Sequence, residues 1–149
     1  LPAVGIGIAG GTGNGLISGL RPVYHFFQMM QMRGIEPLPA TRFNFQGAWQ
    51  RAGELGQVIA GMVQQRKPFS GVEERLLWYD ALPYLGLSRA AERRLLADYT
   101  TMALPSAGDS KIACGLVRAD ALAASGRLLD SLTEVTRVYD AGVKAFEDK

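Results

Sequence analysis

The sequence predicts an α/β region over residues 1–67 followed by an all-helical extension over residues 68–149. In the first part, short apolar runs typical of strands alternate with longer apolar stripes of helical spacing, in the order β-α-β-α. From Pro68 onward no strand pattern remains, and apolar residues recur at helical spacing only. We therefore expect a parallel sheet flanked by helices in the first part and helices alone in the second.

Composition and charge exclude several classes of protein. The chain has 149 residues, within the range of one domain, and 48% of them are hydrophobic, enough to form a core. The formal net charge is only +2, with both signs mixed along the chain, which argues against nucleic-acid binding. The single Cys excludes a disulfide framework, and the single His argues against a zinc site. We expect Cys114 to be a small core residue and His25 to be a surface or interface residue. Without a signal-peptide pattern or an apolar run that spans a bilayer, the protein is predicted to be cytoplasmic.

The first strand is predicted over residues 1–9, as an apolar run buried on both faces of a parallel sheet. Gly5 and Gly7 within it indicate close approach of a helix or of another backbone. The helix that follows has Pro22 in its first turn, where the missing N–H costs nothing, and Gly34 as its predicted C-terminal stop. Its apolar stripe consists of Leu16, Leu20, Val23, Phe27 and Met30.

A second strand is predicted over residues 35–40, and its prolines, Pro37 and Pro39, place it at an edge of the sheet. Asn44 is the predicted N-cap of the second helix, which ends at Arg66-Lys67-Pro68 with positive charge near its C-terminus. The buried face of this helix is predicted to be Ala48, Ala52, Leu55, Ile59 and Met62. Because a two-stranded sheet leaves much apolar surface uncovered, we expect this part of the chain to need a partner.

The extension is predicted to consist of successive amphipathic helices. Ser70-Gly71-Val72-Glu73 fits a capping box, and Ser88 is the predicted N-cap of the next helix. Asp109 or Ser110 begins a third helix, and Gly126 precedes a final apolar stripe. That stripe consists of Leu128, Leu132, Val135, Tyr139, Val143 and Phe146. Such stripes need a surface to cover, so we expect the extension to be a lid or a subunit interface.

The strongest functional signal is the glycine-rich loop Gly10-Gly11-Thr12-Gly13-Asn14-Gly15, between the first strand and the first helix. A strand that leads through such a loop into a helix exposes backbone N–H groups to a nucleotide or phosphorylated cofactor. A P-loop is excluded because Leu16-Ile17 stand where Lys and Ser or Thr are required. Two other interpretations of the loop stay open. One is a dinucleotide fingerprint, matched formally by Gly5, Gly7 and Gly10; the other is a tight structural turn without a ligand.

The same part of the chain resembles a known family over about residues 3–62. The stretch from Ala9 to Gly15, followed by Leu20-Arg21, Phe26-Phe27 and Met32-Arg33-Gly34-Ile35, is similar to the flavodoxin-like NAD(P)H-dependent FMN reductases, particularly the iron–sulfur flavoproteins and related quinone oxidoreductases. In that group the fourth strand ends in a glycine-rich loop that borders the isoalloxazine ring. The resemblance implies the C-terminal part of a flavodoxin-like parallel sheet, FMN as cofactor and NAD(P)H as reductant. It also implies hydride transfer through FMN to a quinone, flavin or other acceptor.

The resemblance places the glycine-rich loop at the flavin edge. Its predicted cofactor-binding residues are Gly10, Gly11, Thr12, Gly13, Asn14 and Gly15. Convergent backbone N–H groups stabilise the negative charge of the reduced ring, and glycine lets the backbone approach without a Cβ. Arg42 follows the second strand at the carboxyl edge of the sheet, where α/β ligands bind, and is a secondary candidate for contact with a phosphate or the flavin edge. The alternative interpretation of Arg42 is an exposed loop arginine.

The predicted flavin site is incomplete within the sequence. A flavodoxin-like fold needs a phosphate-binding loop after its first strand, and neither that loop nor the Cys cluster of the iron–sulfur members is visible here. We therefore expect a missing N-terminal half, or another chain, as a partner. The resemblance also implies a homo-oligomer, and we expect no nucleic-acid or membrane partner. The alternative function is a non-enzymatic α/β-helical subunit or interaction module with a structural glycine loop.

Overall fold

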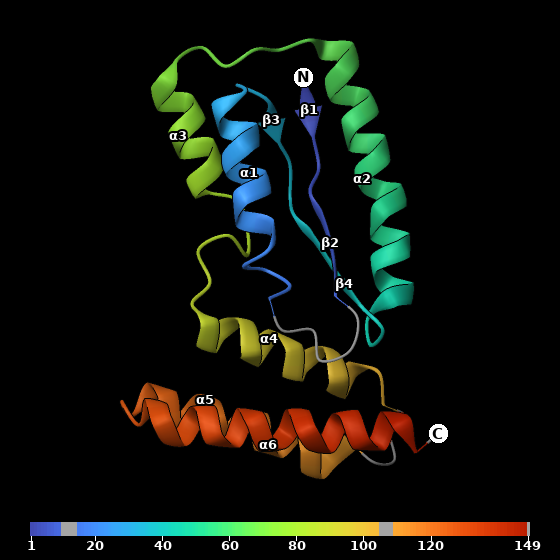
Figure 1. The fold of residues 1–149 in the computed structure, drawn as a ribbon, viewed down its shortest axis with the longest axis vertical. Coiled ribbons are helices and arrows are strands. Elements are labelled where there is room, and N and C mark those ends of the chain that lie inside the picture. Colours follow the sequence, from blue (N-terminus) through green and yellow to red (C-terminus); the bar gives the residue numbers. More distant parts are fainter. Residues whose placement is uncertain (10–14, 105–108, 149) are drawn as a thin grey trace. The chain divides into compact units, whose positions relative to one another are not determined.

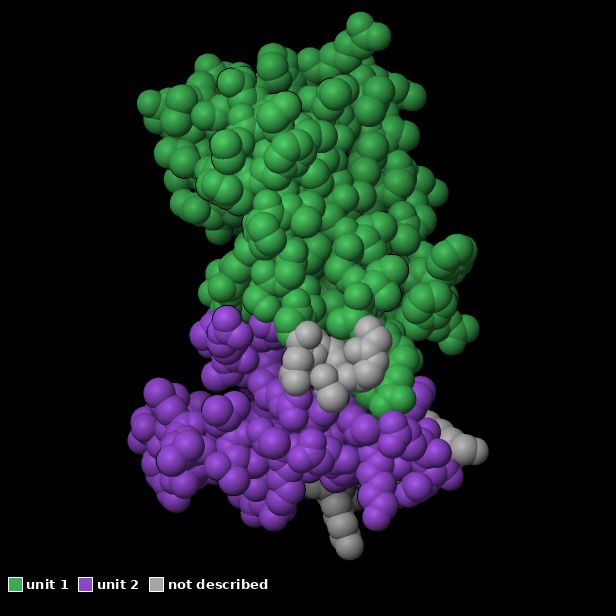
Figure 2. Space-filling view, viewed as in Figure 1, with its two compact units in different colours: residues 1–87 green, residues 88–149 purple. Residues whose placement is uncertain are grey.

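The computed structural model describes residues 1–9, 15–104 and 109–148, which form a mixed α/β chain that is mostly helical (Figure 1). Within those ranges the strands are β1 (Pro2–Ala3), β2 (Ile6–Ala9), β3 (Arg33–Gly34) and β4 (Leu38–Thr41). The helices are α1 (Leu20–Met29), α2 (Phe45–Gln65), α3 (Val72–Asp80), α4 (Arg89–Met102), α5 (Asp109–Ala124) and α6 (Leu128–Glu147). The chain divides into two compact units, Leu1–Leu87 and Ser88–Lys149, which are coloured separately in Figure 2.

The strands run along two chain segments that pair in parallel, as the sequence predicts. β1 pairs with β3, and β2 pairs with β4 in a register that runs from Ile6↔Leu38 to Ala9↔Thr41. The first predicted strand is interrupted between β1 and β2. The second begins later than predicted, because β4 starts at Leu38, and β3 lies before the predicted range, so that two short pairs replace one continuous pair. The second segment carries two prolines and lies at an edge, because β4 pairs with β2 alone among the described residues.

The hydroxyl of Tyr24 bridges the two segments where their pairing is interrupted. It accepts a hydrogen bond from the Gly5 N–H at 3.0 Å and donates one to the Ile35 carbonyl at 2.7 Å. A Cβ on Gly5 would lie 2.5 Å from the Tyr24 ring, and one on Gly7 would lie 3.0 Å from Leu20. Both glycines therefore admit the close approach of α1 that the sequence predicts. Burial raises the pKa of Tyr24 to about 12, so the hydroxyl stays a donor at neutral pH.

Helices α1 and α2 lie on opposite sides of the strand segments (Figure 1). The apolar face predicted for α2 is confirmed, because it packs on a core formed with the second strand segment. This core consists of Ile35, Leu38, Ala40, Ala48 and Leu55, with Val4, Ala52, Ile59 and Met62 packed against it. The face predicted for α1 is only partly correct. Leu20 and Tyr24 are its buried residues, whereas Val23 and Met30 are exposed, because the close contact with the strand glycines turns Leu20 and Tyr24 inward.

The first helix ends earlier than predicted. α1 ends at Met29, and Gln31 takes the left-handed backbone conformation with φ 54°. Gly34, the predicted helix stop, lies instead in β3. Its lack of a side chain serves packing, since a Cβ there would lie 3.2 Å from the rings of both Tyr24 and Tyr79.

One face of β2 is exposed, so the prediction of a first strand buried on both faces is wrong. Ile6 is 53% exposed and Ile8 is 75% exposed. A strand of a parallel sheet is buried by neighbouring strands and by helices on both faces. Among the described residues, β2 has only one neighbouring strand.

Hydrogen bonds hold helix α3 to β3 and to the residue that precedes it. The Trp78 Nε1–H donates to the Gly34 carbonyl at 2.6 Å, and the Tyr79 hydroxyl donates to the Met32 carbonyl at 2.7 Å. The predicted boundary at residue 67 lies before α3, whereas the compact units divide after Leu87. Trp78 and Tyr79 lie in a segment whose sequence pattern is purely helical. Their contact with β3 depends on tertiary packing, which that pattern does not reveal.

The second unit consists of α4, α5 and α6. Ser88 caps α4 as predicted, because its hydroxyl accepts a hydrogen bond from the Ala91 N–H at 3.2 Å. Gly126, with φ 80°, separates α5 from α6. Of the predicted final stripe, Val135 and Tyr139 are buried and Leu128 is 69% exposed.

Close packing of α5 against α6 explains why the prediction for Cys114 is wrong. A Cβ on Gly115 would lie 2.4 Å from a methyl group of Val138, so Gly115 is the position that faces α6. Neighbouring positions of a helix point about 100° apart. Cys114 is accordingly exposed rather than part of the core.

Candidate functional site

The carboxyl ends of β2 and β4 lie side by side because the two strands are parallel. β2 ends at Ala9, which pairs with Thr41, the last residue of β4. The glycine-rich loop therefore follows one strand, and Arg42 follows its neighbour, at a single edge. This is the edge at which ligands bind in α/β proteins.

Two of the predicted site residues, Gly15 and Arg42, are among the described residues. The others, Gly10, Gly11, Thr12, Gly13 and Asn14, lie outside them. Gly15 has φ 83°, a conformation that glycine adopts without strain, and its carbonyl accepts a hydrogen bond from the Gly19 N–H at 2.8 Å. Gly15 thus begins the turn that leads into α1.

An open cavity of about 390 Å³ lies between the exposed face of β2 and the turn that leads into α1. Ile6, Ile8, Gly15 and Val23 contribute to its wall, and its described lining contains no charged side chain. The volume is in the range of small-molecule sites. The described lining therefore offers apolar contacts and no charged partner for a phosphate.

The turn after β4 is held by the side chain of Asn44. Its Oδ1 accepts hydrogen bonds from the Thr41 N–H at 2.7 Å and the Thr41 hydroxyl at 3.0 Å, and its Nδ2 donates to the Pro39 carbonyl at 3.0 Å. Asn44 occupies the predicted N-cap position of α2, but its side chain ties the turn to β4 and caps no helical N–H. Arg42, within this turn, is exposed and its guanidinium lies 4.9 Å from the centre of the Phe43 ring.

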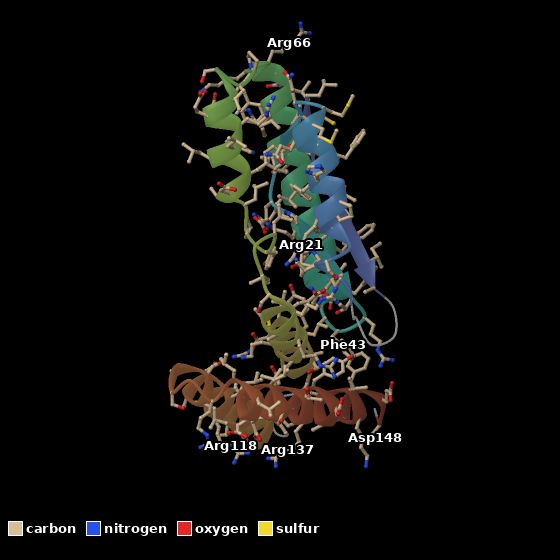
Figure 3. All side chains as sticks on the ribbon, turned by 60° about the vertical axis from the view of Figure 1, so that its left-hand side comes forward. Arg21, Phe43, Arg66, Arg118, Arg137 and Asp148 are labelled. Carbon is tan, nitrogen blue, oxygen red and sulfur yellow. The ribbon has the colours of Figure 1, made fainter. Side chains whose placement is uncertain are left out.

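A larger cavity, of about 580 Å³, lies at the opposite, amino end of the strands. It is bordered by Pro2 and Arg33, the first residues of β1 and β3, and by the segment that follows α2. Figure 3 shows Arg66, at this end of the first unit, far from Phe43 at the carboxyl end. None of the residues around this cavity was predicted as part of a site. The wall is assembled from segments far apart in the sequence, and no local pattern marks them as one surface.

Arg33 is the buried charge of the amino end, with an exposed fraction of 8%. Its guanidinium carbon lies 4.0 Å from the centre of the Phe69 ring and 4.6 Å from that of the Trp78 ring. Its Nη2 donates to the Glu74 Oε1 at 2.9 Å and to the Pro68 carbonyl at 3.0 Å. The Nε is buried and has no hydrogen-bond partner among the described residues.

Glu74 is held as a carboxylate by groups on two sides. The Ser70 N–H donates to its Oε2 at 2.6 Å, and the Ser70 hydroxyl does so at 2.8 Å. The backbone hydrogen bond from Ser70, together with Arg33, lowers the pKa of Glu74 to about 2. The predicted capping box is therefore wrong: Gly71 is the N-cap of α3 without a side-chain cap, and Glu74 rather than Glu73 bonds Ser70.

Several further features limit what chemistry the described residues can support. His25 is exposed on α1. Within residues 1–9, 15–104 and 109–148, no three His, Cys, Asp or Glu side chains come together as metal ligands. In the same ranges, the helices are all too short or too polar to cross a membrane. Comparison of the chain with protein-family models, curated proteins and solved structures gave no match.

Proposed function

We propose that this chain is the C-terminal part of a flavodoxin-like NAD(P)H-dependent FMN oxidoreductase, with the flavin at the carboxyl edge of β2 and β4. One observation carries the proposal. The parallel register ends β2 at Ala9 opposite Thr41, so the glycine-rich loop and Arg42 leave the strands at the same edge. A glycine-rich loop between a strand and a helix at this edge is the arrangement that α/β proteins use for nucleotides and related cofactors.

The lining of the described part of this edge supports a place for the ring of FMN. The cavity beside β2 has an apolar wall of Ile6, Ile8 and Val23, and Gly15 at its rim leaves the backbone accessible. When bound, FMN supplies the hydride chemistry: it accepts a hydride from NAD(P)H and passes it to an acceptor. The chain's own contribution is to orient the ring and to present backbone N–H groups to its negatively charged edge.

The phosphate of FMN needs groups from elsewhere. The cavity beside β2 has no described charged side chain, and Arg42 is the cation nearest to this edge in sequence. The exposed edge of β2 supports a partner at this position. β2 pairs with β4 alone among the described residues, and a strand with one unpaired edge favours pairing with a further strand. The proposal therefore includes a partner that pairs with β2 and supplies the phosphate-binding loop. This partner is either a missing N-terminal half or another chain.

FMN titration tests this function. The natural full-length polypeptide should quench FMN fluorescence saturably, and its visible spectrum should be that of a flavoprotein. Gly13→Val should weaken FMN binding at least about tenfold, since a side chain would block the approach of the backbone to the ring. The matched control is Gly56→Val, on α2, where a Cβ meets nothing within 4 Å.

Other outcomes would overturn the proposal. A colourless protein that leaves FMN fluorescence unchanged would favour the non-enzymatic subunit. Unchanged affinity in Gly13→Val would place the flavin elsewhere. Thermal protection by NAD(H) without FMN would favour the dinucleotide-binding alternative.

A further inference from the structure

The amino-end cavity contains a buried cation whose hydrogen-bonding capacity is not filled. Arg33 is enclosed by the rings of Phe69 and Trp78, and two of its bonds go to Glu74 and Pro68. Its Nε–H has no partner among the described residues. A buried donor without an acceptor is unfavourable, so an acceptor brought by a ligand would be stabilised there.

Backbone strain is concentrated around the same cavity. Among the described residues other than glycine, three have positive φ: Gln31 at 54°, Arg66 at 47° and Tyr84 at 70°. Gln31 and Arg66 both border this cavity. Arg66 is the C-cap of α2, a position at which glycine is the favoured residue in this conformation. Strain of this kind clusters at ligand sites, where the side chain serves a purpose other than stability.

The cavity is positive and apolar at once. Glu74 neutralises Arg33, but Arg66 and Lys67, exposed on the rim, form no ion pair with any described carboxylate. The wall of the cavity also includes the apolar side chains of Met62 and Val63. Its volume of about 580 Å³ is within the range of sites for small molecules.

We propose that the amino-end cavity binds a small amphiphilic anion, a carboxylate or phosphate group on an apolar body. Arg66 and Lys67 attract the anionic group at the rim, and the Arg33 Nε–H offers it a buried donor. Met62, Val63 and Phe69 cover the apolar body. This site is independent of the proposed flavin site, because the two lie at opposite ends of the same strands.

Tryptophan fluorescence provides the test. The chain has two Trp residues, and Trp49 is 73% exposed, so Trp49→Phe leaves Trp78, in the cavity wall, as the single reporter. Octanoate and octyl phosphate should each change the Trp78 emission saturably. The stronger ligand of the two identifies the headgroup. 1-Octanol and inorganic phosphate should each bind at least about tenfold more weakly than the stronger ligand. 1-Octanol lacks the anionic group, and inorganic phosphate lacks the apolar body.

Paired variants in the Trp49→Phe background separate the site from general charge effects. Arg66→Gly with Lys67→Gln removes two rim charges, keeps the backbone of the helix end favourable, and should weaken binding at least about tenfold. Arg89→Gln with Lys144→Gln removes two exposed charges from α4 and α6 and should leave binding unchanged. The proposal is overturned if neither anion changes the Trp78 emission, if 1-octanol or inorganic phosphate binds as well as the anions, or if both double variants behave alike.

Discussion

The two ends of the parallel strands are built in different ways. At the carboxyl end, a single side chain, Asn44, ties a turn to the strand only five residues away, and Arg42 is carried on that turn. At the amino end, Arg33 is held by Pro68 and Glu74, which come from far along the chain. The strand segment from Pro2 to Ala9 spans roughly 23 Å at about 3.3 Å per residue, so the two ends are separate environments.

This difference determines what each end can do. The carboxyl end presents glycine and apolar surface, on which the proposed flavin site depends. The amino end presents a buried guanidinium, rim cations and strained backbone, which suit a small anion. The predictions that follow remove the groups on which this contrast depends.

The largest effect is expected at Arg33. Arg33→Met removes the ion pair with Glu74 and the contact with two aromatic rings, and should lower the free energy of unfolding by about 3 kcal/mol. Arg42→Met, the counterpart at the carboxyl end, should cost under about 1 kcal/mol because Arg42 is exposed. Urea unfolding of both variants measures the difference. Equal losses would mean that the two ends do not differ in this way.

The next largest loss of unfolding free energy is expected at Tyr24, midway between the two ends of the strands. Tyr24→Phe leaves the Gly5 N–H and the Ile35 carbonyl without their bridging partner and should cost about 2 kcal/mol. Tyr84→Phe, in the same unit, serves as the control for loss of a tyrosine hydroxyl, because the Tyr84 hydroxyl has no hydrogen-bond partner among the described residues. A loss in Tyr24→Phe no larger than in this control would remove Tyr24 as the link between the segments.

Tyr24→Phe should also change how the free energy of unfolding depends on alkaline pH. The pKa of Tyr24 is about 12 in the folded chain, against 10.0 for an ordinary tyrosine. Its contribution to stability is therefore full below pH 10 and is lost as the pH rises from about 10 to 12. Between these values the wild type should lose more unfolding free energy than Tyr24→Phe, as measured by urea unfolding at a series of pH values. Parallel losses would contradict the raised pKa.

A smaller effect is expected at the carboxyl end. Asn44→Ala removes the hydrogen bonds to Thr41 and Pro39 and should cost about 1–2 kcal/mol. Gln46→Ala, an exposed position two residues later, should stay within about 0.5 kcal/mol of the wild type. Thermal unfolding measures both. If the two variants are alike, the turn is held by something other than Asn44.

The smallest effect has the opposite sign. Arg66→Gly relieves a left-handed arginine at the end of α2 and should raise the free energy of unfolding by up to about 1 kcal/mol. Gln64→Gly, two residues earlier within the helix, should instead lower it by about 1 kcal/mol. A loss of stability in Arg66→Gly would show that the arginine stabilises the fold and would remove the strain argument for the amino-end site.

Local sequence patterns predicted the elements whose determinants are neighbours along the chain. The face of α2, the start of α2 after Asn44, the cap at Ser88 and the close approach at Gly5 all follow from short-range spacing and residue type. The pairing of β2 with β4 followed from the order of the elements. The role of residues 10–14 and the flavin itself stay predictions.

Other features depend on contacts between distant segments and could not be predicted. Tyr24 was not assigned to the core, because its partners Gly5 and Ile35 are identified only when the strands pair. Arg33 carries no sequence signal of burial, since its aromatic and acidic neighbours lie more than thirty residues away. The exposed face of β2 was missed because an apolar run does not reveal how many strands flank it.

One titration tests the separation of the two ends most directly. The natural full-length polypeptide carrying Trp49→Phe is titrated with FMN, once alone and once with octanoate at saturation of the Trp78 signal. The Trp78 signal is the part of the emission change that is absent when Trp78→Phe is added to the same polypeptide. The account predicts that FMN fluorescence is quenched with the same affinity in both titrations, while the Trp78 signal of bound octanoate persists. Displacement of one ligand by the other, or FMN fluorescence that stays unquenched in both titrations, would contradict it.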